Sequence, residues 1–190
     1  MNQESTKQKI MRVAQTLIRQ SGYHGFSFRD ISLAVNIKTA SIHYYFPTKA
    51  ILVQAIAEDY TMTFMEKLGD PDIFLSTKKR PMDGYIHLFE SSFLNDQNMC
   101  LCGFLGVEKS LLPTDIQAAV TSFFDQNMRW LTRVYSGYGV QSPEPLAFQT
   151  LALLEGAMVT CKALNDATLF NTLSSAIHQL LDAAKSSVSI

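Results

Sequence analysis

Apolar residues recur every three or four positions through nearly the whole chain, which is the spacing of one face of an α-helix. Polar, glycine-rich or proline-rich stretches separate these runs, and no stretch alternates in the manner of a strand. Residues 69–84 are expected to form a loop or one short turn, and residues 137–145 a break. The chain is therefore predicted to be all-α with about nine helices: one that ends near Gly22, two short ones within residues 26–49, and others at about residues 49–67, 82–94, 103–111, 113–135, 146–164 and 167–185.

Residues 26–49 have the pattern of two short helices joined by a tight turn. Ser27 and Asp30 have the spacing of a capping box, in which each side chain satisfies a backbone N–H at the start of the first helix. Asn36 can adopt the left-handed conformation that ends a helix sharply. These features predict a helix-turn-helix whose second helix enters the DNA major groove.

The segment ISLAVNIKTASIHYYFPTK, residues 31–49, resembles the DNA-binding signature of the TetR family of bacterial regulators. The usual form of that signature is Ile-Ala-x-x-Ala-Gly-Val-Ser-x-Gly-x-Leu-Tyr-x-Tyr-Phe-x-Ser-Lys. The chain keeps Ile31, Ala34, Tyr45, Phe46 and Lys49, and departs at Asn36, Lys38, Ala40 and His43. Lys38 stands where the capping serine is usual, and Thr39 could take the capping role in its place.

The second helix supplies the candidate DNA contacts. Its outward residues are expected to touch base edges or the groove floor, where hydroxyl groups can pair with several bases. The resemblance implies a second set that grips phosphates, which orients the domain without choosing sequence. The base-edge candidates are Thr39, Ala40, Ser41, His43 and Tyr44, and the phosphate candidates are Ser27, Lys38, Tyr45 and Lys49. Tyr44 could equally be a packing residue.

Charge divides the chain at the same place. Residues 1–50 carry seven basic and two acidic residues, a net charge of +5, whereas the remainder carries nine basic and fifteen acidic residues, a net charge of −6. A basic segment attached to an acidic body is typical of a DNA-contacting domain. We therefore predict a DNA-binding domain at residues 1–49 and a sensing and dimerisation domain at residues 50–190.

Other features of the composition point to the cytoplasm. No apolar run is long enough to cross a membrane, and the polar start of the chain lacks the apolar region of a secretory signal. Three cysteines give no disulfide framework. No motif of a metalloprotease, P-loop, dinucleotide fold or serine hydrolase occurs, so no enzyme, cofactor or metal site is predicted.

The resemblance implies a cavity for a small-molecule effector in the second domain. Aromatic and methionine residues at helical spacing are its candidate lining, although such residues are more often simply core. Glu108 is the best candidate for a charged contact. The set is Phe64, Phe89, Phe93, Cys100, Phe104, Glu108, Phe124, Met128 and Met158.

The run from Met99 to Glu108 resembles the Gly-Cys-Leu-x-x-x-x-x-x-Glu segment of many TetR-like regulators. Cys100 lies near a predicted helix start, where a thiol becomes more reactive, so Cys100 and Cys102 could sense oxidants or electrophiles. The alternative is that they are small buried apolar residues, and this alternative is favoured.

The last two predicted helices, together with the few residues after them (about 146–187), carry few charges, and Gly156 would permit close approach of another helix. They form either a dimer interface, which the resemblance implies, or a buried centre of one subunit. The overall prediction is a dimeric TetR-like regulator, most readily a repressor, that binds a palindromic operator and is released by a small molecule. The alternative is a helical ligand- or thiol-sensing module with little or no DNA binding.

Overall fold

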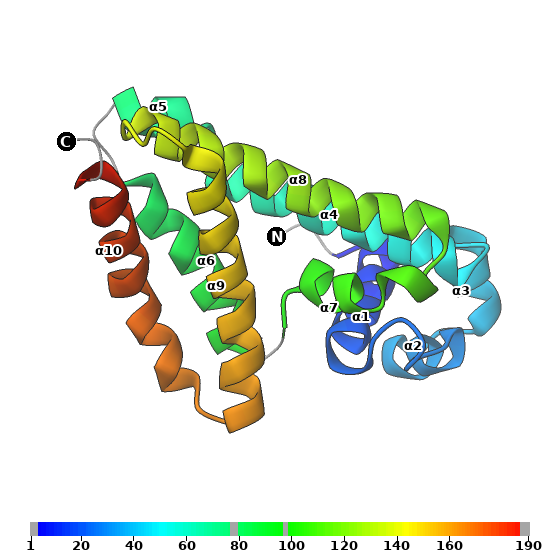
Figure 1. Cartoon of the computed structure of the whole chain (residues 1–190). Helices are drawn as coiled ribbons and strands as arrows, with labels where there is room; N and C mark the ends of the chain where they lie inside the picture. Colours follow the sequence, from blue (N-terminus) through cyan, green and yellow to red (C-terminus); the bar gives the residue numbers. More distant parts are fainter. Residues whose placement is uncertain (1–3, 77–79, 97–98, 187–190) are drawn as a thin grey trace. The chain divides into compact units, whose positions relative to one another are not determined.

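The computed structural model describes residues 4–76, 80–96 and 99–186, and this part of the chain contains helices and turns but no strand (Figure 1). The all-α prediction is therefore confirmed. The helices are α1 (Thr6–Ser21), α2 (Phe28–Val35), α3 (Thr39–Tyr45), α4 (Lys49–Leu68), α5 (Pro71–Ser76), α6 (Pro81–Asp96), α7 (Leu101–Val107), the 3-10 helix η1 (Lys109–Leu111), α8 (Thr114–Gly137), α9 (Pro143–Leu164), the 3-10 helix η2 (Ala167–Thr172) and α10 (Leu173–Ser186).

The chain divides into two compact units. Unit 1 comprises residues 1–62 and 101–123, and unit 2 comprises residues 63–100 and 124–190. Helices α4 and α8 each contribute their first part to unit 1 and their second part to unit 2. These units describe packing, and the functional boundary expected at residue 49 stays a prediction.

Unit 1 is built around the three N-terminal helices, with α1 packed against both α2 and α7. Many apolar positions of these helices lose all or nearly all contact with solvent, whereas Val13 and Leu17 are half-buried and Ala34 is exposed. Its buried side chains include Ile10, Ala14, Ile18, Phe26, Ile31, Ile42, Phe46 and Leu52.

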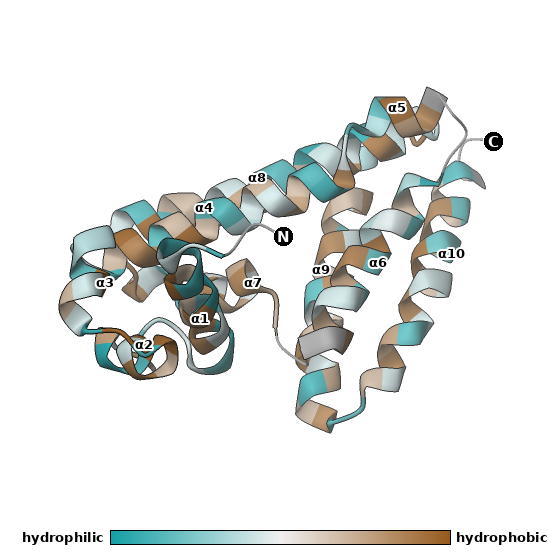
Figure 2. Cartoon of the chain, turned by 180° about the vertical axis from the view of Figure 1, so that it is seen from behind, coloured by the Kyte–Doolittle hydropathy of each residue, from teal (hydrophilic) through white to brown (hydrophobic). Residues whose placement is uncertain are grey.

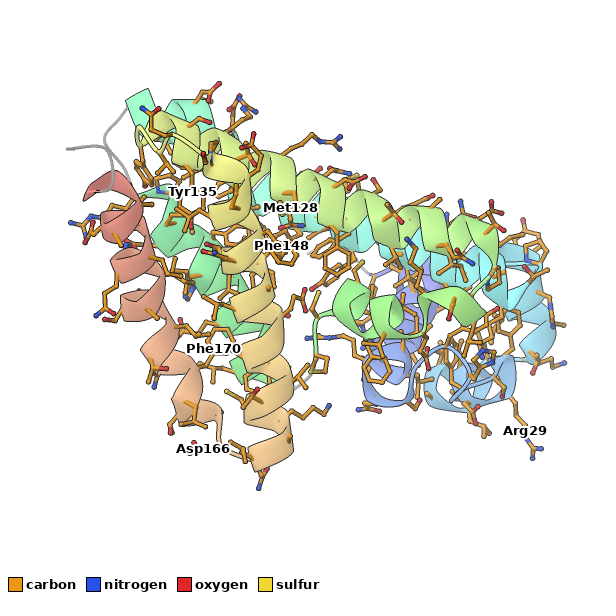
Figure 3. The ribbon with its side chains drawn as sticks, viewed as in Figure 1. Arg29, Met128, Tyr135, Phe148, Asp166 and Phe170 are labelled. Carbon is orange, nitrogen blue, oxygen red and sulfur yellow. The ribbon has the colours of Figure 1, made fainter. Side chains whose placement is uncertain are left out.

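Unit 2 has an aromatic core in which α9 packs against α6, η2 and α10. Tyr85 stacks on Trp130 with ring centroids 5.2 Å apart, and Phe93 stacks on Phe170 at 5.8 Å (Phe170 is labelled in Figure 3). The indole N–H of Trp130 donates to the Gly69 carbonyl at 2.9 Å, so the polar end of this large side chain is satisfied inside the core.

The predicted loop at residues 69–84 contains an additional helix, α5, so the loop prediction was wrong for the described residues of this segment. Residues 77–79 lie outside the described residues. The Asp70 carboxylate accepts the backbone N–H of Asp72 at 3.0 Å, and Pro71 occupies the first helical position, where a missing N–H costs nothing. Arg133 of α8 donates to both carboxylates, at 2.9 Å to Asp70 and 2.5 Å to Asp72. Asp70 and Pro71 therefore start a new helix as well as ending α4.

Three other helix boundaries differ from the prediction. Helix α9 begins at Pro143 because Pro143 and Pro145 occupy its first turn, where their missing N–H groups are tolerated. Helix α7 begins at Leu101 and ends at Val107, with η1 separate from it. The last predicted helix is two elements, because the Asp166 side chain accepts the backbone N–H of Thr168 at 2.9 Å and starts the 3-10 helix η2.

Within the described ranges, no helix combines the length and the apolar character that crossing a membrane requires.

Candidate nucleic-acid interface

The N-terminus of α2 is fixed by the predicted capping box. The backbone N–H and the hydroxyl of Ser27 both donate to the Asp30 carboxylate at 2.7 Å. These hydrogen bonds stabilise the ionised carboxylate and lower the pKa of Asp30. Ser27 is therefore held in a single exposed position at the start of the helix.

The turn between α2 and α3 has the predicted left-handed residue at its centre. Asn36 adopts φ 58° and ψ 50°. The Ile37 N–H donates to the Ser32 carbonyl at 3.1 Å, and the Ser32 hydroxyl donates to the Ile37 carbonyl at 2.7 Å. This reciprocal pair closes the turn and fixes the direction in which α3 leaves it.

Helix α3 presents a continuous exposed surface. Lys38 is the residue that precedes the helix, and its side chain makes no capping hydrogen bond. Thr39 lies inside the helix, so it does not take the capping role that was open to it. Ile42 is fully buried, and the residues around it face outward to different degrees. Lys38, Ala40, His43, Tyr44 and Tyr45 are exposed, whereas Thr39 and Ser41 are half-buried.

His43 has a defined orientation. Its ring lies edge-on to Phe28 of α2 with centroids 4.8 Å apart, and its Nδ1 is 3.2 Å from the Pro47 carbonyl. A carbonyl can only accept, so Nδ1 carries the proton and Nε2 is left as an acceptor in the neutral ring. His43 can therefore accept a hydrogen bond from an amino group on a base edge.

Lys49, expected to grip phosphate, has partners inside unit 1. Its ammonium donates to the Phe26 carbonyl and lies over the rings of Phe26 and Tyr23, at 4.1 and 4.8 Å from their centroids. Partial burial lowers the pKa of Lys49. These contacts favour a structural role, in which Lys49 ties the start of α4 to the turn between α1 and α2.

Glu108, expected to contact an effector, also has a partner in unit 1. Its carboxylate accepts the Tyr23 backbone N–H at 2.8 Å. It lies against Gly22, which ends α1 with φ 75°, and a side chain at that glycine would overlap the carboxylate. Glu108 thus caps the turn after α1, and its ligand role stays a prediction.

Arg29 is a candidate that the sequence argument missed, because only the second helix of the motif was searched for base readers. It lies in the first turn of α2, is exposed, and extends away from that helix (Figure 3). Guanidinium pairs with two acceptors on the edge of guanine. An arginine two residues after the capping serine was the available signal.

The predicted effector-binding residues are divided between the two units. Phe104 and Glu108 belong to unit 1, whereas the other seven belong to unit 2. Phe64 and Phe89 are in ring contact at 5.4 Å, and Met158 and Cys100 are buried in the same unit. Glu155 of α9 was not predicted from sequence, and its two carboxylate oxygens are buried without a hydrogen-bond partner among the described residues. Phe124 and Met128 are half-buried on α8.

A capped three-helix domain with an exposed third helix defines a helix-turn-helix protein, here attached to a second all-α unit. The family model described as bacterial regulatory proteins, tetR family, matches residues 10–56. A crystal structure of a TetR transcriptional regulator from Legionella pneumophila is 33% identical with a TM-score of 0.87, over 94% of this chain and 98% of that one. The chain therefore belongs to the TetR family of transcriptional regulators.

Two curated relatives are similar over part of their length. The probable HTH-type transcriptional regulator YttP of Bacillus subtilis (strain 168) is 31% identical over 74 residues, which cover 39% of this chain and 36% of that protein. The biofilm operon icaADBC HTH-type negative transcriptional regulator IcaR of Staphylococcus epidermidis (strain ATCC 35984 / DSM 28319 / BCRC 17069 / CCUG 31568 / BM 3577 / RP62A) is 37% identical over 62 residues, which cover 33% and 34%. The chain thus aligns with about a third of the length of these relatives.

Proposed function

We propose that this protein is a cytoplasmic repressor that binds a palindromic operator as a homodimer and is released by a small-molecule effector. The observation that carries the proposal is α3, whose exposed side chains project from a helix fixed by the Asn36 turn and the buried Ile42. The net charge of +5 over residues 1–50 provides attraction to phosphates. The printed name of the Staphylococcus relative, a negative regulator, supports repression.

A homodimer is supported by the outer face of α9. Phe148, Ala152, Gly156 and Val159 are exposed and follow one another at helical spacing, and Phe148 and Val159 are 64% and 52% exposed. A side chain at Gly156 would meet no atom within 4 Å, so another helix could approach closely. Helix α9 has only three charged residues, Glu144, Glu155 and Lys162, whereas Figure 2 shows that hydrophobic and hydrophilic residues alternate along α10. A two-fold dimer that covers this face would carry two helix-turn-helix domains (called heads below), one for each operator half-site.

Release follows from a shift between two states of the dimer. An effector that binds more tightly to a state with the wrong separation of heads draws the population toward it. The effector needs this difference in affinity, because equal affinity for both states shifts nothing. A ligand-bound structure with the head separation of the DNA-bound form would contradict this mechanism.

The test is a gel shift and footprint with the DNA that flanks the protein's own gene. We expect a protected palindrome whose half-site centres are about one helical turn, or a multiple of it, apart. The double variant Ala40→Glu and Tyr44→Glu should abolish binding, because two carboxylates on the exposed face of α3 repel the phosphates. Thr114→Glu, an exposed position at the start of α8, is the matched control.

Absence of binding at low salt would instead favour the thiol- or ligand-sensing module, although all three cysteines are buried.

Arg29 is proposed to read a guanine through its guanidinium. Replacing it with alanine should weaken operator binding by about 1–3 kcal/mol and relax the preference at one base pair in each half-site. Selection of binding sites from random DNA by the wild-type and variant proteins measures this preference. An unchanged base preference would remove Arg29 from the set of base readers.

A further inference from the structure

The interior of unit 2 contains an aromatic group contributed by three helices. Tyr85 and Phe89 of α6 and Phe64 of α4 are in mutual ring contact, with centroid distances of 5.3–6.1 Å. Trp130 of α8 stacks on Tyr85. These four side chains are at most 7% exposed. Aromatic faces attract cations, and this attraction is stronger where water is excluded.

Glu155 of α9 places a carboxylate in the same interior. The residue as a whole is half-buried, but both of its oxygens are fully buried, so the side chain is turned inward. No donor in the described part of the chain makes a hydrogen bond of good geometry to either oxygen. Buried carboxylates in proteins are normally paired or hydrogen-bonded, because isolating a charge from water is costly.

The groups around Glu155 offset only part of this cost, because desolvation outweighs the effect of Cys100 on its pKa. The Cys100 thiol lies close enough to act on the carboxylate, but a thiol is a weak donor. The Tyr85 hydroxyl has one proton, and it donates that proton to Oδ1 of Asn127 at 2.8 Å. Desolvation accordingly raises the pKa of Glu155 to about 7, and the nearby carboxylate adds to the effect of burial in raising the pKa of Tyr85.

We propose that Glu155 is the recognition group for a cationic aromatic effector, an amidinium or a protonated amine, bound among α6, α8 and α9. This inference rests on the proposed function and specifies the chemical class of its effector. An amidinium offers two parallel N–H donors, which match the two oxygens of a carboxylate. Its ring would lie among the aromatic side chains around Tyr85 and Trp130.

The buried state of the carboxylate also links binding to a change in structure. Because solvent does not reach either oxygen, a ligand must displace the side chains that cover it. The bound state therefore differs in packing from the unliganded one, which is the requirement for an effector that shifts a population. A neutral ligand of the same shape would leave the carboxylate unpaired and would bind more weakly.

The test uses benzamidinium as the probe and benzamide, its uncharged isostere, as the reference. Trp130, the single tryptophan of the chain, reports binding through its fluorescence, and calorimetry gives an independent affinity. We expect the full-length protein to bind benzamidinium at least about tenfold more tightly than benzamide, since one charge-assisted pair distinguishes the two. Glu155→Gln should bring the two affinities within about twofold, because a neutral amide replaces the charge. Glu144→Gln, on the exposed first turn of the same helix, should leave the ratio unchanged.

Equal affinities of the wild-type protein for the two probes would overturn the inference, as would no binding of benzamidinium. A Glu155→Gln variant that keeps the tenfold ratio would also overturn it. If the variant loses affinity for both probes equally, the side chain supports the fold only, and the inference fails. The footprint above is measured separately, so a chain that fails to bind DNA but discriminates the probes through Glu155 would refute the regulator and keep the site.

Discussion

Both compact units pair charged groups internally, as Arg133 does with Asp70 and Asp72 in unit 2, but the units differ in the interior carboxylate of Glu155. In unit 1, Asp30 accepts two hydrogen bonds from Ser27, Glu108 accepts one from Tyr23, and Lys49 donates to the Phe26 carbonyl. In unit 2, Glu155 has both oxygens buried without such a partner, and α9 exposes a stripe that includes Val159. The first unit satisfies these groups internally, whereas the second leaves an interior charge and an apolar surface uncompensated.

This difference bears on how a regulator of this family can work. A helix that reads a fixed sequence of base edges must hold its side chains in one geometry, and the contacts around α2 and α3 do this. A unit that changes state with its surroundings needs groups whose free energy changes on binding. In the mechanism proposed above, Glu155 and the exposed face of α9 are the groups that gain from a second molecule.

The largest effect is expected from charging the exposed face of α9. Val159→Glu should convert a dimer to a monomer, because two like charges would be buried in one two-fold interface. Operator binding should fall by roughly 100-fold, since one head makes half the contacts. Sedimentation and the gel shift measure the two effects. Thr114→Glu adds the same charge elsewhere and should leave the dimer intact; a dimeric Val159→Glu protein would exclude this face from the interface.

Glu155 should make the stability of unit 2 depend on pH. Its pKa of about 7 in the folded state exceeds the ordinary value of 4.5, so the folded state binds more protons between these values. The free energy of unfolding should therefore fall as pH rises from about 4.5 to 7, by roughly 3 kcal/mol, and then level off. Denaturation at pH 5 and pH 8, followed through Trp130, measures this loss.

Glu155→Gln isolates the contribution of this carboxylate, because the variant keeps a side chain of the same shape that does not titrate. The free energy of unfolding of the variant should depend much less on pH, and the variant should be more stable than the wild-type protein at pH 8. An identical slope in the two proteins would show that Glu155 does not titrate in the interior.

A smaller effect is expected from removing an internal partner in unit 1. Glu108→Ala leaves the Tyr23 N–H without its acceptor and should lower the free energy of unfolding by about 2 kcal/mol. Thermal unfolding followed by circular dichroism measures the change. Glu58→Ala, which removes an exposed carboxylate of α4, is the control and should change stability little. If Glu108→Ala keeps its stability but loses affinity for the effector, the role predicted from sequence would be restored.

The helix-turn-helix was predictable because its signals are local. The capping box, the left-handed Asn36 and the buried Ile42 each depend on residues within a few positions. The start of α5 was missed for a related reason, since Asp70 and Pro71 serve both to end one helix and to begin the next. Local patterns can be ambiguous when two helices share their boundary residues.

The partners of Glu108, Lys49 and Glu155 could not be predicted from sequence. Glu108 lies 85 residues from Tyr23, and Lys49 lies 23 from Phe26. No spacing in the sequence specifies such contacts, because the first depends on how α7 packs against α1 and the second on where the start of α4 lies relative to the turn after α1. Glu155 belongs to a helix with exposed neighbours, and only the direction of its side chain shows that the carboxylate is buried.

The smallest effect separates the two lysines that the sequence assigned to phosphates. Lys38 is exposed at the start of α3, whereas Lys49 is held by the Phe26 carbonyl and two rings. Lys38→Ala should flatten the dependence of log K on log salt by about one unit for each bound head, because one fewer counterion is released per contact. Lys49→Ala should leave that slope nearly unchanged and lower the melting temperature instead. Lys67→Ala, exposed near the end of α4, is the control and should alter neither quantity. If only Lys49→Ala flattens the salt dependence, Lys49 and not Lys38 contacts the phosphate.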